Sequence, residues 1–375
     1  MDNITESIRN VHLGDVPEES EQLLFSPHPD SGVAESVLDN VPRYLFRVAT
    51  PESDGITNET WVRSEAALRD RGASLEDIFF HLDTKKRTEV AKILNLHLQW
   101  QTKNDLLDNF VSWTSSLLFA IQYIYYRHHK DNTPLEDIKL FVVDTTMFPR
   151  GIFMRDLDLI DIFCESNTRL NDFRSLRNGG TYYFGEYFSQ GSLKIEDKCQ
   201  LIPAQVIFEQ DRLRRIQPRF APISSKASEW AKPVVRLRRN IYLRPSLVSL
   251  TSTEMRDRLQ AIEEIMPHIS ASWRFPIAVY FAGLIGAETS LSDQEVGDDN
   301  LFFAYFHSGT FGWRLGHAEF IIRTLHTESL SPENGHGFVA PDLNPMLARA
   351  GQEVLSKLGR VETMCNELAE VISIV

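Results

Sequence analysis

The feature that most constrains the fold is a set of short apolar segments, spaced irregularly between residues 41 and 210. Segments with strand character cover residues 44–48, 110–113, 138–144, 180–188 and 199–208, and segments with helical character cover 75–101 and 117–128. Either Thr114 or Ser115 could cap the second helix. Helices and strands do not alternate as they do in a parallel βαβ sheet, and strands dominate the second half of the region. This order predicts an α+β domain with a split sheet.

The segments on either side of this region differ from it in composition. Residues 1–40 are acidic and show no periodicity, which predicts a mobile tail. Residues 211–246 hold ten basic residues against two acids, which predicts a basic linker, although a phosphate-binding strip that contacts nucleic acid stays open. Residues 247–375 predict a mainly α-helical domain, with a capping box at 251–254. Apolar residues at heptad spacing over 347–372 predict a helix that packs on its own core or forms a homodimer.

Charge and cysteine content exclude some classes of protein. The formal net charge of −13 argues against a nucleic-acid surface over the whole chain. The three cysteines are widely spaced, which predicts neither a disulfide framework nor a metal site. No signal-peptide pattern is seen, and the longest apolar run, 276–287, is too short to span a bilayer. We therefore expect a cytoplasmic or nuclear protein with no membrane partner.

Three polar residues stand in segments that suggest chemistry. Arg47 ends the apolar segment 44–48, Ser112 lies where a strand runs into a helix, and Glu186 stands among aromatic residues just after Gly179 and Gly180. Taken singly, the arginine predicts a structural ion pair, the serine a helix cap, and the glutamate a charge that protects a strand edge. Their order along the chain carries more information than any one of them.

In this order the motifs resemble the Arg-Ser-Glu class of ADP-ribosyltransferases, the cholera-toxin-like or enterotoxin-like group. Leu45-Phe46-Arg47 is similar to the Leu-Tyr-Arg of the family's first strand, and Ser112 begins a segment similar to its Ser-Thr-Ser motif. Glu186 corresponds to the catalytic glutamate on a late strand. The chain is also similar to fungal proteins that carry this domain. The resemblance implies an ADP-ribosyltransferase-like split β-sheet domain over residues 41–210, with NAD as a substrate.

The resemblance also implies roles that suit the chemistry of NAD cleavage. Arg47 would bind the pyrophosphate through its planar fork of N–H donors. Glu186 would stabilise the positive charge that develops on the ribose as nicotinamide leaves. Ser112 would hold the arginine or the glutamate in place through its hydroxyl. The residues expected to bind NAD are Arg47, Ser112, Trp113, Thr114, Tyr182, Tyr183 and Tyr187.

One departure from the family bears on the acceptor. Members that modify arginine usually carry a second glutamate two residues before the catalytic one, and here Phe184 takes that acceptor-site position. We therefore expect ADP-ribosyl transfer to a macromolecular acceptor other than arginine. Alternatively, Phe184 points into the core and another acid, such as Glu196, serves the acceptor. Two other functions stay open, an NAD glycohydrolase and a catalytically degenerate protein-interaction module.

Overall fold

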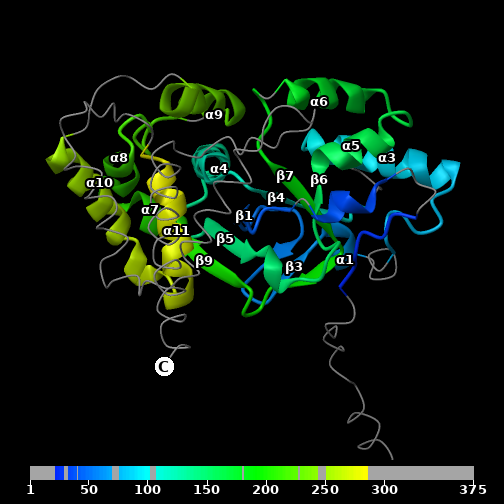
Figure 1. The fold of residues 1–375 in the computed structure, drawn as a ribbon, viewed down its shortest axis with the longest axis horizontal. Helices are drawn as coiled ribbons and strands as arrows, with labels where there is room; N and C mark the ends of the chain where they lie inside the picture. The colour runs from blue at the N-terminus through cyan, green and yellow to red at the C-terminus, as the bar shows by residue number, and fades with distance from the viewer. Residues whose placement is uncertain are drawn as a thin grey trace, which may run out of the picture.

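The computed structural model describes residues 22–28, 33–39, 41–69, 76–101, 107–179, 181–226, 229–243 and 251–285. Within these ranges the strands form two antiparallel sheets, a larger one in the order β6-β7-β4-β1-β5-β9 and a smaller one in the order β2-β3-β8 (Figure 1). The strands of the larger sheet are β1 Tyr44–Ala49, β4 Phe110–Thr114, β5 Lys139–Asp144, β6 Met154–Arg155, β7 Glu186–Gln190 and β9 Cys199–Pro203. The smaller sheet contains β2 Ile56–Thr57, β3 Trp61–Arg63 and β8 Ser192–Lys194.

The helices gather in two groups beside the larger sheet. Figure 1 shows α3, α5 and α6 near β6 and β7, whereas α7, α8, α10 and α11 lie beyond β5 and β9. Between the two groups lies α4, and α9 packs against it. The helices are α1 Glu65–Arg69, α3 Thr84–Leu98, α4 Leu117–Lys130, α5 Asp156–Phe163, α6 Arg169–Asn178, α7 Ala204–Phe208, α8 Arg212–Ile216, α9 Ala231–Arg238, α10 Ser252–Glu263 and α11 Ala271–Gly283. Helices and antiparallel sheets in one chain confirm the predicted α+β class.

Alternation along β1 divides the core between the two faces of the larger sheet. Tyr44, Phe46 and Val48 pack in one cluster with α4 and the helices that follow β9. Leu45 and Ala49 pack in another cluster, between the larger and the smaller sheet. Successive side chains of a strand point to opposite faces, so an apolar strand buried on both sides carries a continuous apolar run.

The predicted helix over 75–101 begins later than expected. Asp83 caps α3, because its carboxylate accepts a hydrogen bond from the backbone N–H of Lys86 at 2.7 Å. Residues 76–83 form turns instead of a helix. Ile78 and Phe79 are buried in these turns, and their apolar side chains extend the helical pattern of the sequence beyond the helix itself.

The cap of α4 is Ser116, and neither Thr114 nor Ser115 takes that position. The Ser116 hydroxyl accepts from the backbone N–H of Phe119 at 3.0 Å. Thr114 is still in β4, where its hydroxyl donates to the backbone carbonyl of Phe184 at 2.7 Å. The strand therefore continues through Thr114, and the cap lies two residues further along the chain, at Ser116.

The observed strand β9 is half as long as the strand predicted over 199–208. β9 ends at Pro203, and α7 begins at the next residue, Ala204. Proline has no backbone N–H to continue a ladder and is tolerated at the first positions of a helix. The Ala204 N–H donates to the carbonyl of Ile138 at 2.8 Å, which ties the new helix to the strand beside it.

The basic segment 211–246 was expected to be a linker, and its described part is folded instead. Ile216 of α8 and Val234 of α9 are fully buried in the same cluster as α10 and α11. Arg215 pairs with Asp257 and Glu264, which come from the following segment. The excess of basic residues is visible in the sequence, but the acidic residues that pair with them in the folded chain are not.

Only residues 251–285 of the predicted helical domain are described. Thr251 and Glu254 form the predicted capping box of α10, and α11 contains most of the apolar run that begins at Pro276. The heptad segment 347–372 and residues 1–21, 29–32 and 40 of the acidic segment lie outside the described residues. The described parts of the predicted mobile tail, 22–28 and 33–39, pack on the folded domain instead: Phe25 is buried, and its backbone N–H donates to the carbonyl of Gly151 at 2.7 Å. Among the described residues, no helix has both the length and the apolar character needed to cross a bilayer.

Candidate functional site

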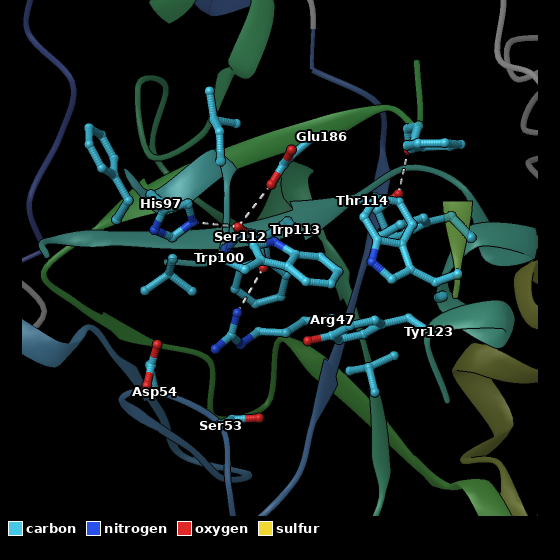
Figure 2. Close-up of a pocket in the computed structure, with 18 of the residues that line it drawn as sticks. Arg47, Ser53, Asp54, His97, Trp100, Ser112, Trp113, Thr114, Tyr123 and Glu186 are labelled. Atoms are coloured by element: carbon cyan, nitrogen blue, oxygen red, sulfur yellow. Dashed lines mark hydrogen bonds between the residues drawn. The ribbon is translucent and has the colours of Figure 1, made fainter. Parts of the chain in front are cut away.

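A cavity of about 560 Å³ opens between the larger sheet and helices α3, α4 and α6. Its walls include Arg47 of β1, Ser112 of β4 and Glu186 of β7, and these three strands are neighbours in the sheet. The structure therefore brings together three residues that lie far apart in the sequence. Figure 2 shows Ser112 at the centre of this group, with Arg47 on one side and Glu186 and His97 on the other.

Ser112 is bonded to both of the other residues, but through different atoms. Its backbone carbonyl accepts from Arg47 Nη1 at 2.8 Å, and its hydroxyl donates to Glu186 Oε1 at 3.0 Å (Figure 2). Arg47 Nε donates to the hydroxyl of Thr57 at 2.9 Å. The sequence predicted that the serine hydroxyl would hold the arginine or the glutamate. In the structure, the serine hydroxyl is hydrogen-bonded to Glu186, and the serine backbone carbonyl is hydrogen-bonded to Arg47.

Arg47 reaches this cavity because the sheet opens beside it. β1 pairs with β5 along its whole length, but it pairs with β4 only where Phe46 faces Thr114. Strand alternation puts Arg47 on the side of Leu45, opposite to the side on which Ser112 points. The guanidinium extends to the carbonyl of Ser112 where the ladder between β1 and β4 is interrupted. The split in the sheet is thus what joins the arginine to the other two residues.

The charge of Arg47 suits an anionic ligand. Both of its hydrogen-bond acceptors, the Thr57 hydroxyl and the Ser112 carbonyl, are neutral. Burial lowers the pKa of Arg47 to about 10, so the guanidinium still carries its charge at neutral pH. Among charged groups, the Asp54 carboxylate of the cavity lining acts on Arg47 and opposes the effect of burial. A partly buried positive charge whose hydrogen-bond acceptors are neutral also gains from an anion that enters the cavity.

His97 and Asp108 extend the network on the side away from Arg47, and the sequence did not predict them. His97 Nε2 lies 2.6 Å from Ser112 Oγ, and its Nδ1 lies 2.5 Å from Asp108 Oδ2. Asp108 is almost fully buried. The Ser112 hydroxyl carries one hydrogen and has two possible acceptors, His97 and Glu186. The hydroxyl donates to Glu186, as described above, when His97 Nε2 is a donor to the serine oxygen.

Arg177 and Asp156 extend the network behind Glu186, and they too were missed. Arg177 Nη2 donates to Glu186 Oε2 at 2.9 Å, and Nη1 forms an ion pair with Asp156. Burial raises the pKa of Asp156 to about 7. The charge of Glu186 adds to this rise, whereas the charge of Arg177 opposes it. Burial acts against the charge of Arg177, but Asp156 and Glu186 outweigh it and raise the pKa of Arg177. The candidate glutamate thus has a partner on each oxygen.

The predicted aromatic NAD contacts do not form one surface. Tyr182 lines the cavity, but Tyr183 does not, and Tyr187 is fully buried between the sheets. Trp113 touches the cavity wall, while its indole N–H donates to Ser189 at 2.9 Å inside the core. Strand alternation explains this difference, because Trp113 and Tyr187 pair with each other on the face opposite to Ser112.

A different group of aromatic residues lines the cavity. We call it the aromatic wall, and its members are Trp100, Phe119, Tyr123, Tyr126, Phe184 and Trp230. The rings of Trp100 and Trp230 lie 4.7 Å apart at 31°. Trp100 is 43% exposed and has a φ of 53°, which is an unusual conformation for a bulky residue. The wall comes from four separate segments, so no local sequence pattern indicates it.

Phe184 belongs to this wall and is held firmly. Its ring stacks on Phe119 with centroids 5.4 Å apart and meets Trp230 at 5.3 Å. Glu196, the acid considered as its substitute, pairs with Lys194 at 3.2 Å and is not part of the cavity lining. The position expected for the acceptor residue is therefore aromatic, and Glu196 does not supply a carboxylate there.

Comparison with known proteins gives one match. Residues 40–195, less than half of the chain, are similar to a family described as Domain of unknown function (DUF7587). Neither the curated proteins nor the solved structures contain a match. The matched range includes Arg47, His97, Ser112, Arg177 and Glu186. The whole network around the cavity therefore lies within the part of the chain that this family shares.

Proposed function

We propose that residues 41–210 form an ADP-ribosyltransferase-like domain that transfers ADP-ribose from NAD to a macromolecular acceptor. One observation carries this proposal. Ser112 is bonded to Arg47 through its carbonyl and to Glu186 through its hydroxyl, so the three residues form one connected group on a cavity wall. The cavity, at about 560 Å³, is within the range of sites that bind small molecules and cofactors.

The binding step uses the charge of Arg47. The pyrophosphate of NAD carries two negative charges, and the guanidinium presents several N–H donors in one plane. Arg47 uses Nε and Nη1 for Thr57 and Ser112, and its side chain is part of the cavity lining. The aromatic wall, to which Trp100 and Tyr123 belong, offers flat apolar surfaces for a nicotinamide or adenine ring.

The transfer step uses the charge of Glu186. The bond between ribose C1′ and the nicotinamide nitrogen breaks, nicotinamide leaves with the electron pair, and the ribose becomes positively charged. The Glu186 carboxylate stabilises that charge, and the acceptor then attacks C1′ and loses a proton. Ser112 fixes one carboxylate oxygen, and His97 in turn fixes Ser112. A carboxylate that is already oriented needs little reorganisation during the reaction.

The Asp108–His97–Ser112 arrangement also has the distances of a nucleophilic triad, with 2.5 Å and 2.6 Å between partners. Acyl transfer at Ser112 would need hydrogen-bond donors around the oxyanion that forms there. Instead, the Glu186 carboxylate lies 3.0 Å from the serine oxygen and would repel an oxyanion. We therefore favour a role for His97 in orienting Ser112.

An NAD glycohydrolase is the second candidate, and the surroundings of Phe184 favour it. The ring of Phe184 is packed between Phe119 and Trp230, so the expected acceptor position offers no carboxylate to activate a protein side chain. Water needs no such orientation, because it is small and present in excess. A degenerate domain that only binds a partner is the third candidate.

One experiment separates the three candidates. Purified protein is incubated with NAD, and nicotinamide release is followed with and without cell lysate. Release that depends on lysate, together with labelling of a lysate protein, supports the transferase. Release without lysate supports the glycohydrolase. If no nicotinamide is released under either condition, the proposal of an enzyme is wrong and the interaction module is favoured.

A further inference from the structure

Arg177 is one of the few nearly buried cations in the described residues, and both ends of its guanidinium meet an acid. Its side chain is 8% exposed, and Asp156 is fully buried. Nη2 donates to Glu186 Oε2 at 2.9 Å, while Nη1 pairs with Asp156. Glu186 Oε1 accepts from Ser112 at 3.0 Å. Each oxygen of the Glu186 carboxylate therefore has its own donor.

This arrangement is not explained by stability alone. Removing charges from water is costly, and buried ion pairs often contribute less to the free energy of unfolding than apolar residues of similar size. Arg174, on the same helix, shows the ordinary arrangement, a pair with Asp161 in which both side chains are more than 40% exposed. Arg177 instead lies on the cavity wall, directly behind the carboxylate to which the proposed reaction gives the main role.

We propose that Arg177 is a positioning residue for Glu186. It fixes one carboxylate oxygen while Ser112 fixes the other, and Asp156 holds the guanidinium in place. The inference rests on the proposed function, because Glu186 is the residue whose orientation matters. A lysine could not replace Arg177, since a single ammonium group cannot donate to two acids in the plane of a guanidinium fork.

The same contacts bear on the choice of acceptor. An arginine acceptor needs a carboxylate to hold and activate its guanidinium. Here Arg177 already occupies Glu186 Oε2 and Asp156. The protein's own guanidinium therefore already takes one oxygen of the Glu186 carboxylate, which leaves less of it for the guanidinium of an arginine acceptor.

The test removes this guanidinium and then supplies it from solution. Arg177→Ala should lower kcat for nicotinamide release by roughly 10-fold or more, the effect of losing one hydrogen bond to a charged group, with a smaller change in KM. Guanidinium chloride at low millimolar concentration should restore part of kcat, whereas sodium chloride at the same ionic strength should not. Arg177→Lys should remain impaired. Arg174→Ala, on the same helix, is the matched control and should behave as the wild type.

A second measurement does not depend on activity. Low guanidinium concentrations should raise the Tm of Arg177→Ala by occupying the vacated site, and they should not raise the Tm of the wild type or of Arg174→Ala. If the wild type releases no nicotinamide but this shift is seen, the proposed function fails and the guanidinium site between Asp156 and Glu186 stands. If activity is seen but the shift is not, the site is wrong and the function stands.

Three results would overturn the inference. Full kcat in Arg177→Ala would show that Glu186 needs no second donor. A loss of kcat that guanidinium does not restore, with a fall in Tm, would show that Arg177 only stabilises the fold. ADP-ribose found on Arg177 by mass spectrometry of the wild type would make Arg177 an acceptor instead of a positioning residue.

Discussion

His97 Nε2 lies 2.6 Å from the hydroxyl oxygen of Ser112, which in turn donates to Glu186. This contact predicts that the imidazole acts on the reaction through Ser112. His97→Ala should lower kcat by roughly 10-fold or more, because the serine hydroxyl loses the partner that orients it, while the Kd for NAD changes little. Nicotinamide release and calorimetric NAD binding measure the two effects. His268→Ala, an exposed histidine away from the cavity, serves as the control.

The neutral partners of Arg47 predict a defect in binding when the guanidinium is replaced. Arg47→Lys keeps a positive charge but loses the planar fork, so the Kd for NAD should rise by roughly 10- to 100-fold. Isothermal titration calorimetry gives the value directly. Arg150→Lys is the matched control, because Arg150 pairs with Asp39 at the exposed surface. An unchanged Kd in Arg47→Lys would place the pyrophosphate elsewhere.

The packing of Phe184 predicts that arginine is not the acceptor. Agmatine is a soluble mimic of the arginine side chain, and it should not be modified when it is supplied with NAD. The aromatic ring offers no acceptor for its N–H groups, although it could stack on the cation. Product analysis by mass spectrometry makes this test sensitive. Efficient formation of ADP-ribosyl-agmatine by the wild type would contradict the prediction.

The raised pKa of Asp156 predicts a pH dependence of stability. An aspartic acid usually titrates near 3.9 in an unfolded chain. In the folded protein, burial and the charge of Glu186 raise the pKa of Asp156 to about 7, against Arg177 and Arg155, which lower it. The folded state then binds the proton more tightly, so this contribution to stability is complete below about pH 4 and is lost as the pH rises through about 7. Between about pH 5 and pH 8, the free energy of unfolding should fall by on the order of 2–3 kcal/mol more in the wild type than in Asp156→Asn.

Urea denaturation at both pH values measures this difference. Urea is preferred to guanidinium chloride, because guanidinium could enter the site that Arg177 occupies. The other titrating groups are shared by the two proteins and largely cancel in the comparison. Equal changes in the wild type and in Asp156→Asn would show that Asp156 keeps an ordinary pKa in the folded protein.

Local patterns predicted the strands that carry Arg47 and Ser112, whereas the strand predicted over 180–188 begins only at Glu186 and runs to Gln190. Each of these residues lies in or beside a short apolar segment that is visible in the sequence, and the α+β class follows from the order of those segments. His97 and Arg177 could not be predicted in the same way. They lie on helices, and whether a helical polar residue faces a cavity depends on how α3 and α6 pack against the sheet.

The errors in the fold have the same origin. The arginines of segment 211–246 looked solvated because their partners, such as Asp257, lie about 40 residues further along the chain. Trp113 and Tyr187 looked available to a ligand because aromatic residues beside a candidate glutamate suggest a binding surface. Strand alternation buries both of them on the opposite face, and the register that decides this is a property of the paired sheet.

The substitution Glu186→Gln tests the central claim most directly. It keeps the shape and one of the two oxygen acceptors to which Ser112 and Arg177 donate, but it removes the negative charge and replaces the other acceptor with an amide donor. Turnover of NAD should fall by roughly 100-fold or more, with little change in the Kd for NAD, because the charge acts mainly in the transition state. Glu196→Gln, which lies outside the cavity, should retain wild-type turnover. Full turnover in Glu186→Gln would contradict the role proposed for Glu186 and, with it, the proposed reaction.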